Sequence, residues 1–499
     1  MKPFRILLFL LSVFAILLLV SFFFPSDGIR IHNKFTLRFV TPEEIFQKDA
    51  VVYKDISEIL SQSLVLYDSL PSVDELPEAA DYTNLDSSRS NEDSLQINIH
   101  RIEFPANDSS ILFPFFRQLK HLNTTGELIR ILHYGDSQIE QDRMTSYIRS
   151  RLQDRFGGSG IGLRPAVSLY GFQLSLRHYA SDNWKRYTAF GNNDLSPEHN
   201  RYGVLASFAR FTPYPEDDIQ KDANSHTAWI QLVEPGRVKS LSGKYDLCRI
   251  YYGNCTEPVM YELYTDNALF DVDFLLPTTG VSEKSWHFNK PPSDLKIEFT
   301  GYVSPDFYCI ALDGKRGIAV DNIPMRGSSG LVFTKIDQSM LKDMYKALNV
   351  KMLLLQFGGN AVPYIASNYS WYEKKFTNQL LMLKKICPGV PIIVIGVSDM
   401  SIKEKDVVVS YPNLESIRDA LKNATFNAGC AYWDMYEAMG GANSMPAWVN
   451  AEPPLASPDF IHFNSTGARI IAEMFYNAFI YEYDNYLEIT ENQKTSSRK

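Results

Sequence analysis

The sequence predicts a mixed α/β protein in which a three-layer α/β/α domain with a parallel sheet is interrupted by an antiparallel β-sandwich or jelly roll. Near-continuous apolar strands alternate with helical patterns at about 101–165 and again at 306–485, which is typical of a parallel sheet covered on both faces. Between these parts, residues 166–305 contain short stretches of alternating apolar and polar residues and no long helical pattern. An apolar run near the start adds an N-terminal transmembrane helix to this fold class.

Residues 1–25 predict a membrane anchor. Lys2 and Arg5 precede an uncharged run from Ile6 to Phe24, which is long enough to cross a hydrocarbon core of about 30 Å as a helix. A cleaved signal peptide is the alternative, but its apolar region would be unusually long and no small-x-small cleavage site precedes Pro25. We expect a retained single span with its basic end in the cytoplasm and the remaining chain on the extracytoplasmic (periplasmic or cell-surface) side of a bacterial membrane.

Residues 26–100 predict a stalk with patches of order. Ile29–Phe39 alternates like a strand, whereas 72–96 is rich in Asp, Glu, Ser and Pro. A segment so poor in apolar residues cannot offset its ordering entropy, so we expect it to be a flexible linker.

The first α/β part begins with a buried strand at Leu128–Gly135, followed by a helix at Gln138–Phe156. Gly157–Gly162 then ends that helix. This glycine run follows a helix rather than a strand and carries no lysine, so it predicts a turn and not a phosphate-binding loop.

The middle region, 166–305, predicts antiparallel strands separated by Gly, Pro, Asn and Asp, for example at 227–233, 249–252 and 295–300. After it, strands are expected at 317–325, 351–357, 391–397 and 430–435, and helices at 337–348, 371–386, 414–426 and 466–483. Residues 486–499 are expected to be a polar tail.

Composition excludes some functions. The net charge is −9 and no basic stripe is interleaved with aromatic residues, which argues against a nucleic-acid partner. The histidines and cysteines form no cluster with metal-ligand spacing, so no metal or organic cofactor is expected. Cys248 and Cys255 flank a short aromatic segment and are close enough to close a hairpin by a disulfide; alternatively, all five cysteines are small buried hydrophobic residues.

Chemistry-bearing residues stand where strands end. Ser137 follows the strand that stops at Gly135-Asp136, and His462 lies three residues after Asp459, before the last helix. In an open parallel sheet, active groups gather at the carboxyl ends of the strands. We therefore expect Ser137 to be a nucleophile, His462 its base and Asp459 the group that orients the imidazole.

Two further strand-ending loops supply candidate oxyanion donors, the Gly327 N–H and the Asn360 side-chain amide, beside the N–H of Ser137 at the start of its helix. Each of these polar residues also has a purely structural interpretation: Ser137 and Asp459 as caps, His462 as a hydrogen-bonded loop residue and Asn360 as a turn residue. Trp433 and Asp434 are assigned to packing rather than to catalysis.

The ordered set Gly135-Asp-Ser137, Gly327, Gly358-Gly-Asn360 and Asp459-x-x-His462 resembles the four sequence blocks of the SGNH (GDSL-type) serine hydrolases. The resemblance covers about 101–165 and 306–485. It implies a Ser137–His462–Asp459 triad and an oxyanion hole made by Ser137, Gly327 and Asn360. One departure is the third block, Gly-Gly-Asn-Ala, where many members have Asp after Asn.

Within that family, a β-sandwich inserted after the first block is similar to the layout of bacterial peptidoglycan O-acetylesterases, in which the insert resembles a carbohydrate-binding module. The resemblance implies an envelope-anchored esterase that removes an O-acetyl or similar small acyl group from a glycan. An O-acyltransferase using the same triad and an inactive glycan-binding surface protein are the alternatives.

Overall fold

The computed structural model describes residues 3–25, 29–32, 35–37, 39, 53–67, 100–168, 172–173, 175–191, 196–212, 214, 224–234, 244–404 and 407–496. The chain divides into two compact units, 1–53 and 54–499. The expected flexible segment at 72–96 lies outside the described residues.

The N-terminal unit contains one apolar helix and a small hairpin. Helix α1 (Pro3–Phe23) is, among the residues that the structure describes, the one helix long and apolar enough to cross a membrane. A membrane span, a signal anchor and a signal peptide all have this character. Strands β1 (Ile29–His32) and β2 (Phe35–Leu37) pair antiparallel, so the expected single strand at 29–39 is a hairpin.

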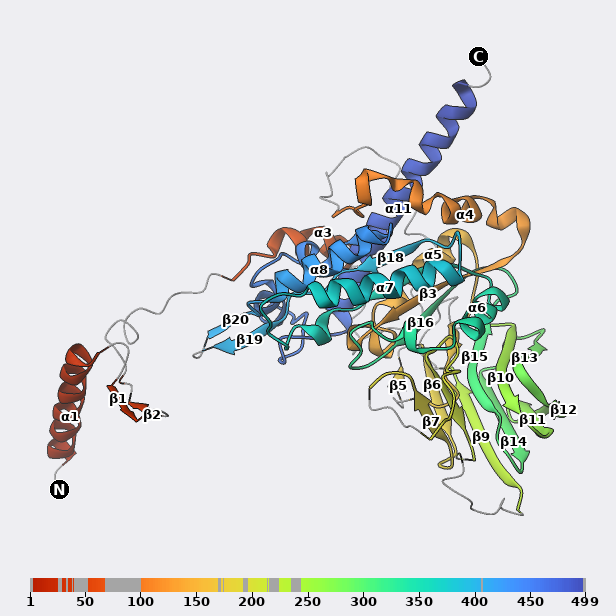
Figure 1. Cartoon of the computed structure of the whole chain (residues 1–499), viewed down its shortest axis with the longest axis horizontal. Coiled ribbons are helices and arrows are strands. Elements are labelled where there is room, and N and C mark those ends of the chain that lie inside the picture. Colours follow the sequence, from red (N-terminus) through yellow and green to blue (C-terminus); the bar gives the residue numbers. More distant parts are fainter. Residues whose placement is uncertain are drawn as a thin grey trace. The chain divides into compact units, whose positions relative to one another are not determined.

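A five-stranded parallel sheet forms the centre of the larger unit, in the order β16-β3-β17-β18-β21. Figure 1 labels β3, β16 and β18 of this sheet. The strands of the sheet are mostly apolar and almost entirely buried, as expected for a sheet covered on both faces. The bounds are β3 (Leu128–Gly135), β16 (Gly317–Pro324), β17 (Val350–Gln356), β18 (Ile392–Ile395) and β21 (Ala431–Trp433).

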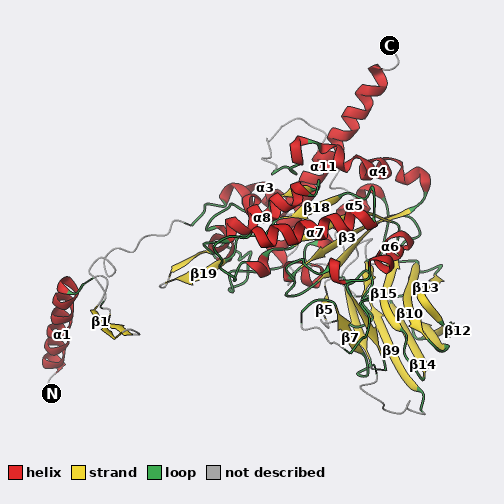
Figure 2. Ribbon diagram, viewed as in Figure 1, coloured by secondary structure: helices red, strands yellow, loops and turns green. Residues whose placement is uncertain are grey.

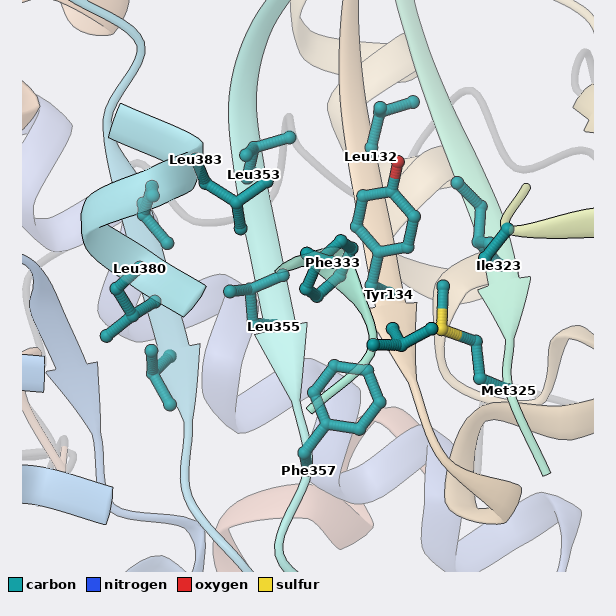
Figure 3. Close-up of a cluster of buried hydrophobic side chains, with 14 of the residues drawn as sticks. Leu132, Tyr134, Ile323, Met325, Phe333, Leu353, Leu355, Phe357, Leu380 and Leu383 are labelled. Carbon is teal, nitrogen blue, oxygen red and sulfur yellow. The ribbon is translucent and has the colours of Figure 1, made fainter. Parts of the chain in front are cut away.

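Helices cover both faces of this sheet. Leu132 and Tyr134 on β3 point into a core shared with α6 (Gln338–Ala347), α7 (Ser370–Ile386) and α8 (Leu414–Asn427), part of which Figure 3 shows. Ile129 and Ile131, which alternate with them, point into a second core shared with α4 (Phe113–Thr125), α5 (Thr145–Phe156) and α11 (Ser465–Ser496). The three-layer arrangement predicted from the alternating pattern is therefore confirmed.

Short elements complete the α/β part. They are the 3₁₀ turns η2 (Pro105–Asn107), η3 (Ser109–Leu112), η4 (Ser137–Asp142), η6 (Phe333–Lys335) and η7 (Gly359–Ala361), the helices α3 (Ser57–Tyr67), α9 (Met435–Ala438) and α10 (Ser444–Val449), and the hairpin β19–β20 (Ser401–Glu404, Val407–Ser410).

Two antiparallel sheets stand apart from the parallel one, and Figure 2 shows their strands in yellow. They share one apolar core, which contains Ile230, Ile250 and Ile310. One sheet has the order β13-β10-β15-β8-β7, with β4 also paired to β15, and the other has the order β12-β11-β14-β9-β6-β5. Their bounds are β4 (Gly162–Arg164), β5 (Phe172–Gln173), β6 (Leu176–Ala180), β7 (Lys185–Thr188), β8 (Ser207–Arg210), β9 (His226–Val233), β10 (Leu247–Cys255), β11 (Val259–Thr265), β12 (Ala268–Leu275), β13 (Thr278–His287), β14 (Asp294–Gly301) and β15 (Asp306–Asp313).

A buried ionic cluster joins the two kinds of sheet. Arg130 on β3 donates to Asp321 on β16 at 2.6 Å and to Asp313 on β15 at 2.5 Å. Arg249 on β10 donates to the same Asp313 carboxylate at 2.7 Å. Because β15 leads directly into β16, the antiparallel sheets are attached to the parallel sheet by chain connection and by buried charge. Apolar packing adds to this, since Tyr308 of β15 lies in the same core as α6.

Some sequence predictions are corrected at element boundaries. The helix expected at 138–156 is instead η4 followed by α5, because Gln141 and Asp142 adopt positive φ angles of 59° and 67°. The antiparallel strands extend from 162 to 313 rather than from 166 to 305, since β4 and β15 belong to them. The expected polar tail is helical as far as Ser496.

Part of the expected stalk is packed. Ile56 is buried in the second core, where it lies near Gly440, and Ile59 and Leu60 of α3 pack against that core. The five cysteines are free and buried, as in the second of the two interpretations above.

Candidate active site

Ser137 lies at the carboxyl end of β3, the strand between β16 and β17 in the parallel sheet. Gly135 makes the turn possible, since a Cβ there would lie 2.9 Å from Ile139 Cδ1 and 3.0 Å from the Gln356 carbonyl oxygen. The cap of η4 is Asp136, whose carboxylate accepts the Gln138 N–H at 3.0 Å. Because Asp136 fills the capping role, the Ser137 hydroxyl is directed elsewhere.

A chain of hydrogen bonds joins Ser137, His462 and Asp459. Ser137 Oγ lies 2.8 Å from His462 Nε2, and His462 Nδ1 lies 2.7 Å from Asp459 Oδ2. Asp459 and His462 share one loop, which lies more than three hundred residues after Ser137 in the sequence, and the structure brings the three side chains together. This order of contacts is the one in which an imidazole can accept a hydroxyl proton through one nitrogen while a carboxylate holds the other.

The loop before α11 is shaped around the Asp459 carboxylate. Asp459 Oδ1 accepts the backbone N–H groups of Ile461 at 2.9 Å and His462 at 3.0 Å, while Oδ2 faces the ring. Phe460 between them adopts a φ angle of 57°, an uncommon conformation for a bulky residue, which folds the loop back on itself. Partial burial opposes ionisation of Asp459, but these hydrogen bonds outweigh it and lower the pKa of the carboxyl.

Gln138 and Arg143 tie the serine turn to the histidine loop, and the sequence analysis did not identify either. Gln138 Nε2 donates to the Ile461 carbonyl at 2.6 Å, and its Oε1 accepts the Phe463 N–H at 3.3 Å. Arg143 donates to the carbonyls of Ser137 at 2.6 Å and Phe463 at 2.8 Å. Both residues therefore fix the turn that carries Ser137 relative to the loop that carries His462. The sequence signal that could have identified them is their position, one and six residues after the serine.

Gly327 and Asn360 lie on the loops that follow β16 and β17, the two strands beside β3. Gly327 is exposed and has a φ angle of 75°, a conformation that favours glycine. The Asn360 amide donates to the Ser328 carbonyl at 3.1 Å, which links the two loops. An amide nitrogen carries two hydrogens, so this bond leaves one N–H for another acceptor.

Asp136 connects the serine turn to η7. Its carboxylate accepts the backbone N–H of Gly359 as well as that of Gln138. Burial raises the pKa of Asp136 to about 6, although these hydrogen bonds oppose the change. Ser137, Gly327 and Asn360 thus belong to three adjacent loops that are hydrogen-bonded to one another.

Comparisons with known proteins identify the fold. No family model matches the sequence, and no curated protein matches it. Among solved structures, one titled "Peptidoglycan O-acetylesterase in action, 5 min" matches with a TM-score of 0.58 and 18% identity, covering 74% of this chain and 96% of that one. The chain has an SGNH (GDSL-type) esterase-like fold.

Two further solved structures match at lower TM-scores. A salicylyl-acyltransferase from a tetracycline biosynthetic pathway has a TM-score of 0.27 and 12% identity, covering 63% of this chain and 96% of its own. A family two carbohydrate esterase from Clostridium thermocellum in complex with cellohexaose has a TM-score of 0.23 and 7% identity, with coverages of 61% and 99%.

Other polar and aromatic residues at the strand ends of this SGNH fold have structural uses. Trp433 is fully buried, packs against Phe475 and donates its indole N–H to the His100 carbonyl at 2.9 Å. Asp434 caps α9 by accepting the Glu437 N–H at 3.2 Å. Over the described ranges, no group of three or more His, Cys, Asp or Glu side chains is arranged to hold a metal ion.

Proposed function

We propose that this protein is an envelope-anchored serine esterase that removes an O-acetyl or similar small acyl group from a glycan, such as peptidoglycan or another cell-envelope polysaccharide. The observation that carries the proposal is the hydrogen-bonded series Ser137–His462–Asp459 at the carboxyl end of β3. The carboxyl ends of the strands are where α/β proteins bind their ligands, and the SGNH-type fold supports the proposal as well.

In the first half-reaction, Ser137 Oγ attacks the ester carbonyl and its proton passes to His462 Nε2. Asp459 holds the protonated imidazole through Nδ1. The negative charge on the carbonyl oxygen is stabilised by the N–H groups of Ser137 and Gly327 and by the second N–H of the Asn360 amide. Collapse of the tetrahedral intermediate breaks the ester bond, and His462 gives its proton to the leaving sugar oxygen.

In the second half-reaction, water loses a proton to His462 and attacks the acyl-serine. Expulsion of Ser137 Oγ, which takes the proton back from His462, releases the carboxylic acid and restores the enzyme. Atoms and charge balance with water as the other reactant.

The remaining parts of the chain have roles that follow from this proposal. Helix α1 within residues 1–25 is a retained anchor, 26–100 connects it to the catalytic part, and the SGNH hydrolase domain comprises 101–165 and 306–485. The middle region, 166–305, is an inserted β-sandwich together with the strands β4 and β15 that border it. The acylated glycan is the partner on the extracytoplasmic side, where such polymers are found.

The test is hydrolysis of p-nitrophenyl acetate by the full-length protein in detergent, beside Ser137→Ala and His462→Ala. We expect both substitutions to reduce the rate to background while circular dichroism stays unchanged, because each removes an essential group from the proton path. His121→Ala, which alters an exposed histidine on α4, is the matched control and should retain full activity. Substantial turnover by a well-folded Ser137→Ala variant would refute the mechanism.

A further inference from the structure

An exposed aromatic side chain lies on the loop that follows the Asn360 turn, whose backbone is held by hydrogen bonds. Tyr364 is 73% exposed and its neighbour Ile365 is 65% exposed, although most large apolar side chains of the α/β part are buried. Single apolar residues are ordinary on a protein surface, but two consecutive exposed ones beside a candidate active site are candidates for contact with a ligand.

The backbone of this loop is fixed from below by one buried hydroxyl. The Tyr369 side chain donates to the Tyr364 carbonyl at 2.9 Å and accepts the Ala366 N–H at 3.0 Å. Asn413, which is buried, donates to the same hydroxyl at 2.6 Å and to the Val362 carbonyl at 2.8 Å. One donated and two accepted hydrogen bonds use the full capacity of a phenol hydroxyl, so the Tyr369 hydroxyl is fully hydrogen-bonded within the protein.

Inward-facing residues therefore hold the loop, and Tyr364 and Ile365 contribute little to that anchoring. Ser367 and Asn368, also exposed, give the surface a polar border. An aromatic face with a hydroxyl at its edge and polar groups around it suits a ligand with an apolar C–H face and a hydroxyl rim, which is the character of a sugar ring. Because the backbone that carries Tyr364 is already held, a ligand that stacks on the ring need not order the loop.

The connection to Ser137 is short. Gly359 N–H is bonded to Asp136, Val362 N–H to the Gly359 carbonyl at 3.2 Å, and Tyr364 N–H to the Ala361 carbonyl at 3.1 Å. Residues 359–364 thus form a compact succession of tight turns, which at a rise of about 2 Å per residue spans roughly 10 Å. A polymeric glycan whose ester lies at Ser137 is long enough to cover a distance of this size.

We propose that Tyr364, with Ile365 beside it, is a stacking platform for a sugar ring of the glycan substrate, a subsite for the alcohol side of the ester. The inference rests on the proposed esterase function and specifies where its substrate lies. It makes Tyr364 a specificity-determining residue, because a small ester such as p-nitrophenyl acetate has no sugar ring to place on it.

The experiment compares two substrates, a soluble O-acetylated peptidoglycan disaccharide and p-nitrophenyl acetate, with the full-length protein in detergent. We expect Tyr364→Ala to reduce kcat/KM for the glycan ester about tenfold more than kcat/KM for p-nitrophenyl acetate, mainly through KM. Tyr364→Phe, which keeps the ring, should restore the glycan rate. Tyr302→Ala, which removes a tyrosine 57% exposed between β14 and β15, should leave both rates unchanged.

Equal losses on both substrates, or no loss on either, would overturn the platform. Its failure is distinguishable from failure of the proposed function by titrating the disaccharide into Ser137→Ala and into Ser137→Ala/Tyr364→Ala. Binding that weakens about tenfold in the second protein supports the platform even if hydrolysis is absent. No binding to Ser137→Ala overturns it even if Ser137-dependent hydrolysis of p-nitrophenyl acetate is present.

Discussion

At the scale of single residues, the site depends on which atoms of Asp459 face which donors. Oδ1 serves two backbone N–H groups and Oδ2 serves the imidazole, so the carboxylate both shapes the loop and orients the ring. In the proposed mechanism this second bond fixes the tautomer that leaves Nε2 free to accept the Ser137 proton. A substitution that preserves the shape of the Asp459 side chain can separate its effect on the loop from its effect on the imidazole.

Asp459→Asn is predicted to lower kcat by between about a hundredfold and ten-thousandfold with little change in stability. The asparagine oxygen can still accept the Ile461 and His462 N–H groups, whereas its NH₂ group faces Nδ1 and favours the tautomer with hydrogen on Nε2. Steady-state kinetics with p-nitrophenyl acetate measures the effect, and Asp182→Asn, in an exposed turn, is the control. If the Asp459 variant were as active as its parent, Asp459 would have no part in catalysis.

At the scale of elements, the turn after β3 differs most from what the sequence predicts. Apolar spacing favours one helix over 138–156, but α5 is preceded by a 3₁₀ turn that ends in two left-handed residues. Asp142 explains the break, because its carboxylate accepts Arg149 at 2.7 and 3.0 Å and Arg164 at 3.2 Å. These contacts are tertiary, so periodicity along the chain could not reveal them.

The same turn gives Arg143 its position, from which its guanidinium reaches carbonyls on both catalytic loops. Arg143→Ala is predicted to lower kcat by about ten- to a hundredfold while KM changes little, because small displacements of Ser137 from His462 slow proton transfer more than they weaken binding. The kcat of Arg143→Lys, which keeps one charged donor nitrogen, should lie between the values of the parent and of the alanine variant.

Arg155→Ala is the matched control for this arginine, since Arg155 pairs with Asp484 on the exposed side of α5. Kinetics across the four proteins, with circular dichroism to confirm folding, tests the interpretation. A rise in KM at constant kcat would place Arg143 in substrate binding instead of in the positioning of the catalytic loops.

At the scale of the whole molecule, local patterns predicted the layers well and their junctions poorly. The strands of the parallel sheet are continuous apolar runs, and those of the middle region alternate, so both sheet types could be recognised from short windows. The pairing of β4 with β15 and the burial of Ile56 arise from contacts between distant segments. No pattern in one sequence reports such contacts directly, which is why the boundaries at 162 and 313 and the packing of α3 were missed.

The ionic cluster at the junction predicts how the larger unit unfolds. Arg130 is fully buried and neutralises Asp321 on its own sheet and Asp313 on the antiparallel sheet. Arg130→Met would leave Asp313 with Arg249 but would remove the only cation that the structure shows bonded to Asp321 among the described residues. Removal of one partner of a buried pair typically costs about 3–5 kcal/mol, compared with at most about 1 kcal/mol for the exposed pair changed in Arg155→Ala.

The sign of the pH dependence follows from Asp321. Burial already raises the pKa of this carboxyl, against the opposing effect of Arg130, and loss of the guanidinium raises it further. The folded variant then binds a proton that the unfolded chain releases, so the destabilisation caused by Arg130→Met should be smaller at pH 5 than at pH 8. Urea unfolding at both pH values, followed by circular dichroism and by tryptophan fluorescence, measures the loss in free energy of unfolding.

The same unfolding curves test whether the two kinds of sheet unfold together. We expect circular dichroism and fluorescence to report one shared transition, because the ionic cluster joins the two kinds of sheet. Two separate transitions in the parent protein would show instead that the sheets fold independently.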